Sequence, residues 1–343
     1  MTELAEQPQD WTEPGAHPVV PGVHRIPLPL PLDGLHAVNV YVVDDPAGPV
    51  VVDSGWAGSE TGRRLEAGLR SLGYGLDDVS QFVVTHAHWD HYTHALTLRS
   101  RYGTRVRLGR GERPSIEDFD LSLGCYPRQV VTLRRCGAPG LAEEIAAMEP
   151  EPQDVNTPFT FPDEWLDHGD RLGMKQRDLE VLATPGHTRG HIVLRDAEAG
   201  LLFSGDHVLP HITPSLGLER TPEPRPLRSF LDSLHLVRDL PDTLLLPAHG
   251  PVTRSVHRRV DELVEHHRRR LEETAAVVRA GAETAFDVAR SLPWTRRRRP
   301  LDELPPTHRM TAVLEMAEHL DLLADTGALA VFESDGVRRY AAR

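Results

Sequence analysis

Four side chains that could bind metal ions lie within one short stretch, Thr85–His91. They are His86, His88, Asp90 and His91. The apolar run before them (82–84) is typical of the end of a buried strand. On extended backbone His86 and His88 face the same side, because they are two residues apart, whereas Asp90 and His91 follow where the chain must bend and can face a second point. Imidazoles and a carboxylate at this density are typical of metal sites, so the stretch predicts two metal positions served by one loop.

Three more loops carry residues of the same chemistry, each after a predicted strand. They hold His187 and His191 after strand 179–182, Asp206 and His207 after strand 201–203, and His249 after strand 243–246. Loops at strand ends are where a rigid sheet presents catalytic groups. One histidine in such a loop is more often structural, but four such loops together predict one shared site.

The pattern of elements divides the chain into three parts. Residues 1–20 are polar and rich in proline and are expected to form an N-terminal arm. Residues 21–252 alternate short strands with helices and are expected to form the catalytic domain, interrupted at 110–165 by an insertion or lid too long for a simple connection. Residues 253–343 contain three predicted helices and a hairpin with an Asp-Gly turn, the order of elements in a winged-helix module.

Charge and cysteine content limit the expected partners and location. The formal net charge of −13 argues against bulk attraction to nucleic acid or anionic membranes. Two cysteines imply no disulfide framework. The N-terminus lacks the pattern of a signal segment, and no apolar run approaches the roughly 20 residues that cross a bilayer. We therefore expect a cytoplasmic protein with no membrane partner; a homodimer is compatible with these features.

The motifs together resemble those of the metallo-β-lactamase-fold hydrolase superfamily. His-x-His-x-Asp-His (86–91), Pro-Gly-His (185–187), Gly-Asp (205–206) and His-Gly (249–250) occur in the family's order, and Asp53 matches its early strand-end aspartate. The resemblance covers residues 20–252. It implies a fold of the α/β (α+β) class, an αββα sandwich with a dinuclear site at one edge, followed here by the small helical winged-helix-like domain.

The resemblance also implies a role for each candidate ligand. His86, His88 and His187 would hold the first metal, Asp90, His91 and His249 the second, and Asp206 would bridge them. Asp90 would also be catalytic by orienting the hydroxide between the metals. Asp53 and His207 are expected to support the ligands from behind. Five imidazoles and two carboxylates suit two Zn²⁺ ions, with Fe or Mn compatible with the same geometry.

Asp206 directs the expected activity away from antibiotics. The true β-lactamases of the superfamily carry a cysteine at this position, and the site here looks like those of hydroxyacylglutathione hydrolases (glyoxalase II), lactonases and related esterases. We therefore expect hydrolysis of a thioester, ester or lactone, on a small-molecule or carrier-bound acyl substrate, by a metal-bridging hydroxide.

Two alternatives stay open at this point. A phosphodiesterase or ribonuclease could use the same dinuclear site; the winged-helix-like module favours it, and the acidity of the chain opposes it. A non-enzymatic, metal-stabilised binding protein is the third reading. A deep apolar pocket beneath 110–165 would favour the acyl hydrolase, and an open basic groove would favour the nuclease.

Overall fold

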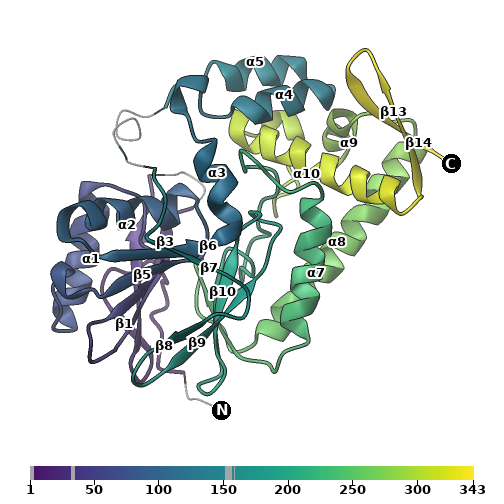
Figure 1. Ribbon diagram of the computed structural model, residues 1–343. Helices are drawn as coiled ribbons and strands as arrows, with labels where there is room; N and C mark the ends of the chain where they lie inside the picture. The colour runs from purple at the N-terminus through teal and green to yellow at the C-terminus, as the bar shows by residue number, and fades with distance from the viewer. Residues whose placement is uncertain (1–3, 32–34, 151–156, 158) are drawn as a thin grey trace.

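Two sheets face each other and helices cover their outer sides (Figure 1). The structure, a computed structural model, describes residues 4–31, 35–150, 157 and 159–343. One apolar cluster lies between the sheets, a second under α1 and α2, and a third under α7 and α8. The layers are therefore helix, sheet, sheet and helix, as the resemblance implies.

The first sheet has seven strands in sequence order, antiparallel from β1 to β4 and parallel from β4 to β7. Its strands are β1 His17–Val20, β2 Val23–Pro29, β3 Ala37–Val43, β4 Val50–Val52, β5 Gln81–Val84, β6 Arg105–Gly109 and β7 Glu164–Leu166. The connections after β4 and β5 contain α1 (Ser59–Ser71), the 3-10 helix η1 (Leu76–Asp78) and α2 (Trp89–Tyr102). Parallel neighbours place the ends of β4 and β5 at the same edge of the sheet.

The second sheet has five strands in the order β12-β11-β10-β9-β8. They are β8 Arg171–Gly173, β9 Asp178–Ala183, β10 Ile192–Asp196, β11 Leu201–Gly205 and β12 Leu244–Pro247, with α7 (Pro226–Arg238) and α8 (Val256–Arg279) outside. In β10, Ile192 and Leu194 face the first sheet and Val193 faces the outer helices. Successive side chains alternate between faces, so this apolar run fills both layers of core.

The insertion packs against the C-terminal helices. It contains η2 (Arg110–Glu112), α3 (Arg113–Glu117), η3 (Leu121–Leu123), α4 (Pro127–Arg135) and α5 (Pro139–Ala146). The C-terminal segment contains α9 (Ala285–Ser291), η4 (Leu301–Glu303), α10 (Pro306–Asp325), β13 (Leu329–Ser334) and β14 (Val337–Ala342). Leu133 and Ile145 of the insertion share one apolar cluster with Met316 of α10, and Figure 1 shows α4 and α5 lying along α10. The predicted order of three helices and a hairpin is present, while its identity as a winged-helix module stays a prediction.

Several local expectations differ from the structure. Helix α2 begins at Trp89 rather than near Tyr92, because the His88 carbonyl already accepts hydrogen bonds from the backbone N–H groups of His91 and Tyr92 (3.1 and 3.0 Å). Asp90 and His91 therefore lie in the first helical turn. The last four residues of the expected arm form β1, which pairs with β2. No helix in the described part of the chain combines the length and apolar character that a membrane span needs.

One close backbone contact fixes the loop between His187 and His191. A Cβ added at Gly190 would overlap the backbone of Gly111 and Glu112. Backbone atoms cannot move aside as a flexible side chain can, so Gly190→Ala is expected to lower the free energy of unfolding by about 2 kcal/mol or more. Urea unfolding measures this. The control is Gly173→Ala, whose added Cβ meets nothing within 4 Å; an equal loss in both variants would contradict the packing argument.

Candidate metal centre

The predicted ligands come from four strand ends that meet at one edge of the two sheets. His86 and His88 follow β5, His187 lies between β9 and β10, Asp206 follows β11, and His249 follows β12. Asp90 and His91 are supplied by the first turn of α2. The structure brings all seven residues together in three overlapping groups, in each of which the ligand atoms lie within 4.8 Å of one another.

The first group contains three imidazoles. His88 Nδ1 lies 3.0 Å from His86 Nε2 and 3.1 Å from His187 Nε2. The far nitrogen of His187 donates to the Ser215 carbonyl at 2.7 Å, which leaves the lone pair of Nε2 facing the group.

The second group contains Asp90, His91 and His249. Asp90 Oδ2 lies 3.3 Å from His249 Nε2 and 3.5 Å from His91 Nε2. The far nitrogen of His249 donates to the Ala37 carbonyl at 2.8 Å. As in the first group, a backbone acceptor thus fixes the tautomer that presents Nε2 as an acceptor.

Asp206, which forms the third group with His86 and His91, reaches the other two groups with its two carboxylate oxygens. Oδ1 lies 3.4 Å from His249 Nε2 and 3.6 Å from His91 Nε2. Oδ2 lies 3.5 Å from His187 Nε2 in the first group. One carboxylate therefore stands between the two sets of imidazoles.

Unpartnered polar atoms test whether these residues fit metal ions. Among the described residues, His91 Nε2, His249 Nε2 and Asp206 Oδ1 are buried without a hydrogen-bond partner. Leaving such an atom unsatisfied costs about 1–3 kcal/mol, and all three face the shared centre. A cation bound there would satisfy all three atoms at once, so the residues fit a dinuclear metal site.

Burial and neighbouring charge set the protonation of the ligands. Burial lowers the pKa of His88 to about 3 and that of His187 to about 4, so both are neutral at pH 7, the form that binds metal. Burial would also lower the pKa of His91, but nearby carboxylates, Asp90 foremost, raise it well above its usual range. Burial would raise the pKa of Asp90, but His91 and His249 hold it well below its usual range. Asp90 is therefore an ionised acceptor.

Asp53 lies behind His91, on the side away from the other ligands. Its Oδ2 accepts a hydrogen bond from His91 Nδ1 at 3.0 Å, and its Oδ1 accepts from the backbone N–H of Thr85 at 2.8 Å. The residue is 2% exposed and has a φ of +60°, a conformation uncommon for a non-glycine residue. These two hydrogen bonds connect the end of β4 to the ligand loop.

The two other histidines of these loops occupy different environments. His191 Nε2 accepts a hydrogen bond from the backbone N–H of Asp206 at 3.1 Å, and its Nδ1 lies 2.9 Å from Thr184 Oγ1, so it positions the Asp206 loop. His207 is buried; its ring lies 5.2 Å from the ring of Phe230, and within the described structure it forms no hydrogen bond with a predicted ligand. The spacing of these loops gave no signal that His191 rather than His207 would contact Asp206.

Half-buried aromatic rings lie beside the ligand loop. Trp89, between His88 and Asp90 in sequence, stacks on Trp56 and Phe159, with ring centroids 5.8 Å apart in both cases. Phe119 stacks on Phe159 at 4.2 Å. We call Trp56, Trp89, Phe119 and Phe159 the aromatic wall. Sequence reasoning missed it, because the two phenylalanines belong to the insertion.

Most of the predicted catalytic domain matches a known protein family. Residues 33–249 match the family model of the metallo-beta-lactamase superfamily. The probable metallo-hydrolase YqjP of Bacillus subtilis is 26% identical over 87% of this chain and 90% of its own. The beta-lactamase-like protein 2 homolog of Caenorhabditis elegans is 34% identical over 39% of this chain and 44% of its own, so this chain spans less than half of that relative. The hydroxyacylglutathione hydrolase of Cereibacter sphaeroides is 27% identical over 50% of this chain and 48% of its own.

Two solved structures are similar over nearly the whole chain. The metallo-beta-lactamase family protein TTHA1429 of Thermus thermophilus has a TM-score of 0.77 at 26% identity, over 94% of this chain and 99% of that one. A beta-lactamase domain protein from Burkholderia ambifaria has a TM-score of 0.79 at 28% identity, over 96% of this chain and 94% of that one. The similarity therefore extends through the insertion and the C-terminal helices.

The hydrogen bonds of Asp53 lead to a prediction about metal affinity. An asparagine has one acceptor oxygen, so Asp53→Asn leaves either His91 Nδ1 or the Thr85 N–H without an acceptor. We expect metal affinity to fall about 10- to 100-fold, measured by competition with a chromogenic chelator. Asp45→Asn is the control, because Asp45 also accepts two backbone N–H groups, from Ala47 and Lys175, outside the ligand groups. Unchanged affinity in Asp53→Asn, or an equal fall in both variants, would count against this role.

Proposed function

We propose, from the premise that the chain belongs to the metallo-β-lactamase superfamily of hydrolases, that it hydrolyses a thioester, ester or lactone with two metal ions. The single observation that carries the proposal is the position of Asp206, a carboxylate within 3.6 Å of imidazoles in both ligand groups. An oxygen ligand at this position suits hard, oxygen-binding metals as well as zinc.

The proposed mechanism assigns a role to each residue of the centre. His86, His88 and His187 would hold one metal, Asp90, His91 and His249 the other, and Asp206 both. Bound metals of this kind lower the pKa of a water molecule and polarise a scissile carbonyl. Asp90, ionised because of His91 and His249, would accept a hydrogen bond from the attacking water and orient it. Asp53 would keep the Nδ1 proton on His91, and His191 would keep the Asp206 loop in place.

The aromatic wall supports an acyl substrate. Trp89 lies between two ligands in sequence, so an apolar acyl group lying against its ring would extend directly from the reacting carbonyl. Apolar contact with aromatic rings is favourable and tolerant of acyl shape. The name of the Cereibacter sphaeroides relative, which denotes a thioester hydrolase, supports the same chemistry. Zinc is the metal we propose, with iron or manganese as alternatives.

One observation favours a phosphodiester substrate instead. The run Arg296–Arg299 is exposed, and the guanidinium of Arg296 donates to the carbonyl of His211, in the loop that follows Asp206. A phosphate backbone passing the centre would meet these charges. We rank this second, because the chain as a whole is acidic, with a formal net charge of −13.

Parallel assays separate the two substrate classes. We expect the metal-loaded protein to turn over an acyl thioester or a lactone, and to turn over bis-p-nitrophenyl phosphate at least about 100-fold more slowly, because the wall beside the metals is apolar. Initial rates with each substrate, with and without a chelator, measure this. Turnover of the phosphodiester without turnover of the thioester and the lactone would reverse the ranking.

Removal of one ligand tests the centre itself. His88→Ala and Asp206→Ala are expected to lower metal-dependent turnover by at least about 100-fold, because each removes a contact worth several kcal/mol to the metals and the transition state. His235→Ala is the control, an exposed histidine on α7 outside the ligand groups. Circular dichroism checks that each variant is folded. Full activity in a folded His88→Ala or Asp206→Ala protein would disprove the ligand assignment.

A further inference from the structure

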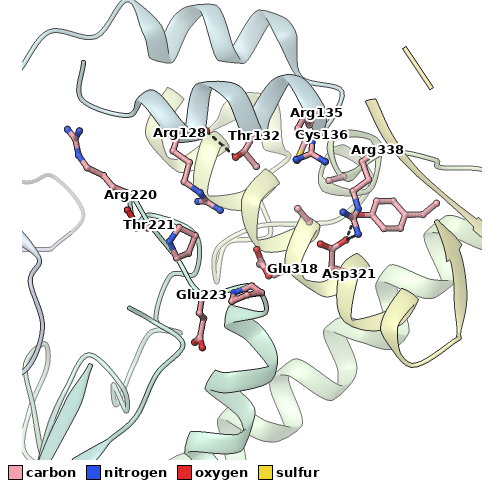
Figure 2. A pocket seen from close by; sticks show the side chains of 15 residues that line it. Arg128, Thr132, Arg135, Cys136, Arg220, Thr221, Glu223, Glu318, Asp321 and Arg338 are labelled. Carbon is pink, nitrogen blue, oxygen red and sulfur yellow. Dashed lines mark hydrogen bonds and ion pairs between the residues drawn. The ribbon is translucent and has the colours of Figure 1, made fainter. Parts of the chain in front are cut away.

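A cavity of about 430 Å³ lies between the insertion, the segment 220–224 and the C-terminal helices. Its walls come from α4, from this Pro-rich segment, from α10 and from β14, and Figure 2 shows side chains of all four parts around it. The volume is within the range of small-molecule sites. None of the candidate metal ligands lines it, so it lies outside the ligand groups. We call it the arginine pocket.

Four arginine residues line the arginine pocket: Arg128, Arg135, Arg220 and Arg338. Arg220 donates to the backbone carbonyls of Asp120 and Gly124 at 2.9 and 3.1 Å, and its guanidinium points away from the pocket in Figure 2. Arg135 lies 3.8 Å from the carboxylate of Glu333. Arg338 is neutralised by Asp321, 2.9 Å away. Arg128 forms no ion pair with the described residues, and its Nη1 lies 3.4 and 3.5 Å from backbone carbonyls of Glu219 and Gly217, which is long for hydrogen bonds. Figure 2 shows the Arg128 side chain pointing from α4 into the space before α10.

The acidic residues of the pocket do not cancel this charge. Asp321 is occupied by Arg338 and by the hydroxyl of Tyr340, which donates to it at 2.5 Å. Burial raises the pKa of Glu318 to about 7, so this carboxylate is partly protonated at neutral pH. Burial also raises the pKa of Glu223. Arg135 and Arg338 thus have ion-pair partners, whereas the half-buried Arg128 has none among the described residues and is available to an incoming anion.

Chain connectivity places the arginine pocket close to the metal centre. The Ser215 carbonyl accepts the hydrogen bond from His187, and Arg220 lines the pocket. Five residues of extended chain span at most about 18 Å, which limits the separation of these two points. Gln129 of α4 fixes the segment between them by donating to the carbonyls of Leu218 and Glu219 at 2.9 and 3.1 Å.

The aromatic wall forms a second connection between the two sites. The Arg220 guanidinium carbon lies 4.7 Å from the Phe119 ring centroid, and the Phe119 and Trp89 centroids are 5.7 Å apart. Arg220 is therefore no more than about 10.4 Å from the Trp89 ring beside the metal ligands. A molecule lying along these rings from the metal ligands would reach the segment 220–224, which lines the arginine pocket.

We propose that the arginine pocket binds a phosphate or carboxylate group at the far end of the substrate whose scissile bond lies at the metal centre. The proposal rests on the acyl-hydrolase function proposed above and adds the substrate's shape: a carbonyl at the metals, an apolar middle against the aromatic wall and an anionic end beside Arg128. Guanidinium groups bind both kinds of oxyanion through charge-assisted hydrogen bonds.

Matched substrate pairs test this proposal and separate the two anions. One pair is S-acetyl-4′-phosphopantetheine and S-acetylpantetheine, which differ only in the phosphate. The other is S-acetylglutathione and its diethyl ester, which differ in the carboxylates. We expect the wild-type KM to be at least about tenfold lower for the charged member of one pair, as a charge-assisted hydrogen bond implies. Equal KM values within both pairs would overturn the proposal.

Variants of the pocket sharpen the comparison. Arg128→Gln should remove most of the preference for the charged substrate while leaving the KM of the neutral one unchanged. Glu318→Gln, which removes a negative charge from the same pocket, should strengthen the preference. Arg134→Gln is the matched control, because Arg134 is exposed on the same helix and lies outside the pocket. A preference that survives in Arg128→Gln would assign the anion to another site and overturn the proposal.

Direct binding distinguishes a failure of this proposal from a failure of the proposed function. Isothermal titration of the metal-loaded protein with 4′-phosphopantetheine or glutathione needs no turnover. Binding that weakens about tenfold in Arg128→Gln but not in Arg134→Gln supports the arginine pocket even if no thioester is hydrolysed. Thioester hydrolysis accompanied by no Arg128-dependent binding or preference supports the hydrolase and overturns the arginine pocket.

Discussion

Seven candidate metal-ligating side chains, six of them buried, converge at one edge of the paired sheets. Burying polar atoms costs free energy unless hydrogen bonds or ions satisfy them. Here the surrounding protein forms hydrogen bonds with the imidazole nitrogens that point away from the centre. Backbone carbonyls of Ala37 and Ser215 accept from His249 and His187, and Asp53 accepts from His91. The ligand atoms that point toward the centre, such as His91 Nε2, His249 Nε2 and Asp206 Oδ1, are left facing one another. Cations at the centre would satisfy these atoms. The strands and helices of the domain hold the loops that bring them together.

The two sheets supply none of the reactive groups from their interior; they hold the ligand loops rigidly and close to one another. Strands β4, β5, β11 and β12 end at the same edge, so loops distant in sequence supply neighbouring ligands. Asp53 connects β4 to the loop after β5, and His191 holds the loop after β11. Gly190 lets the His187 loop touch the backbone at the start of the insertion. Each of these contacts restricts a ligand from behind, which is how a metal centre keeps its geometry.

The insertion connects the metal centre with the C-terminal helices. Phe119 and Phe159 continue the aromatic wall from Trp89, while α4 and α5 share an apolar cluster with α10. The same insertion thus contributes to the surface beside the metals and to the arginine pocket. The cavity that it lines is charged rather than deeply apolar, and the apolar surface is the aromatic wall; together they fit the acyl substrate with one anionic end that we propose. In the function that we propose, the insertion would determine specificity and the loops at the edge of the sheets would carry catalysis.

The sequence alone predicted a metal centre, because candidate metal ligands are recognised by residue type and short spacing. His86, His88, Asp90 and His91 fall within six positions, and His187, Asp206 and His249 each follow an apolar strand that had to be buried. The layers of the fold were implied by the resemblance of these motifs to a known family. Only the tertiary structure decided which residues support the ligands and what surrounds them. His191 rather than His207 contacts Asp206, the wall joins Trp89 to Phe119, and Arg128 meets Arg338 across a cavity. These are contacts between residues 15 to 210 positions apart, and local spacing carries no information about which distant side chains the packing brings together.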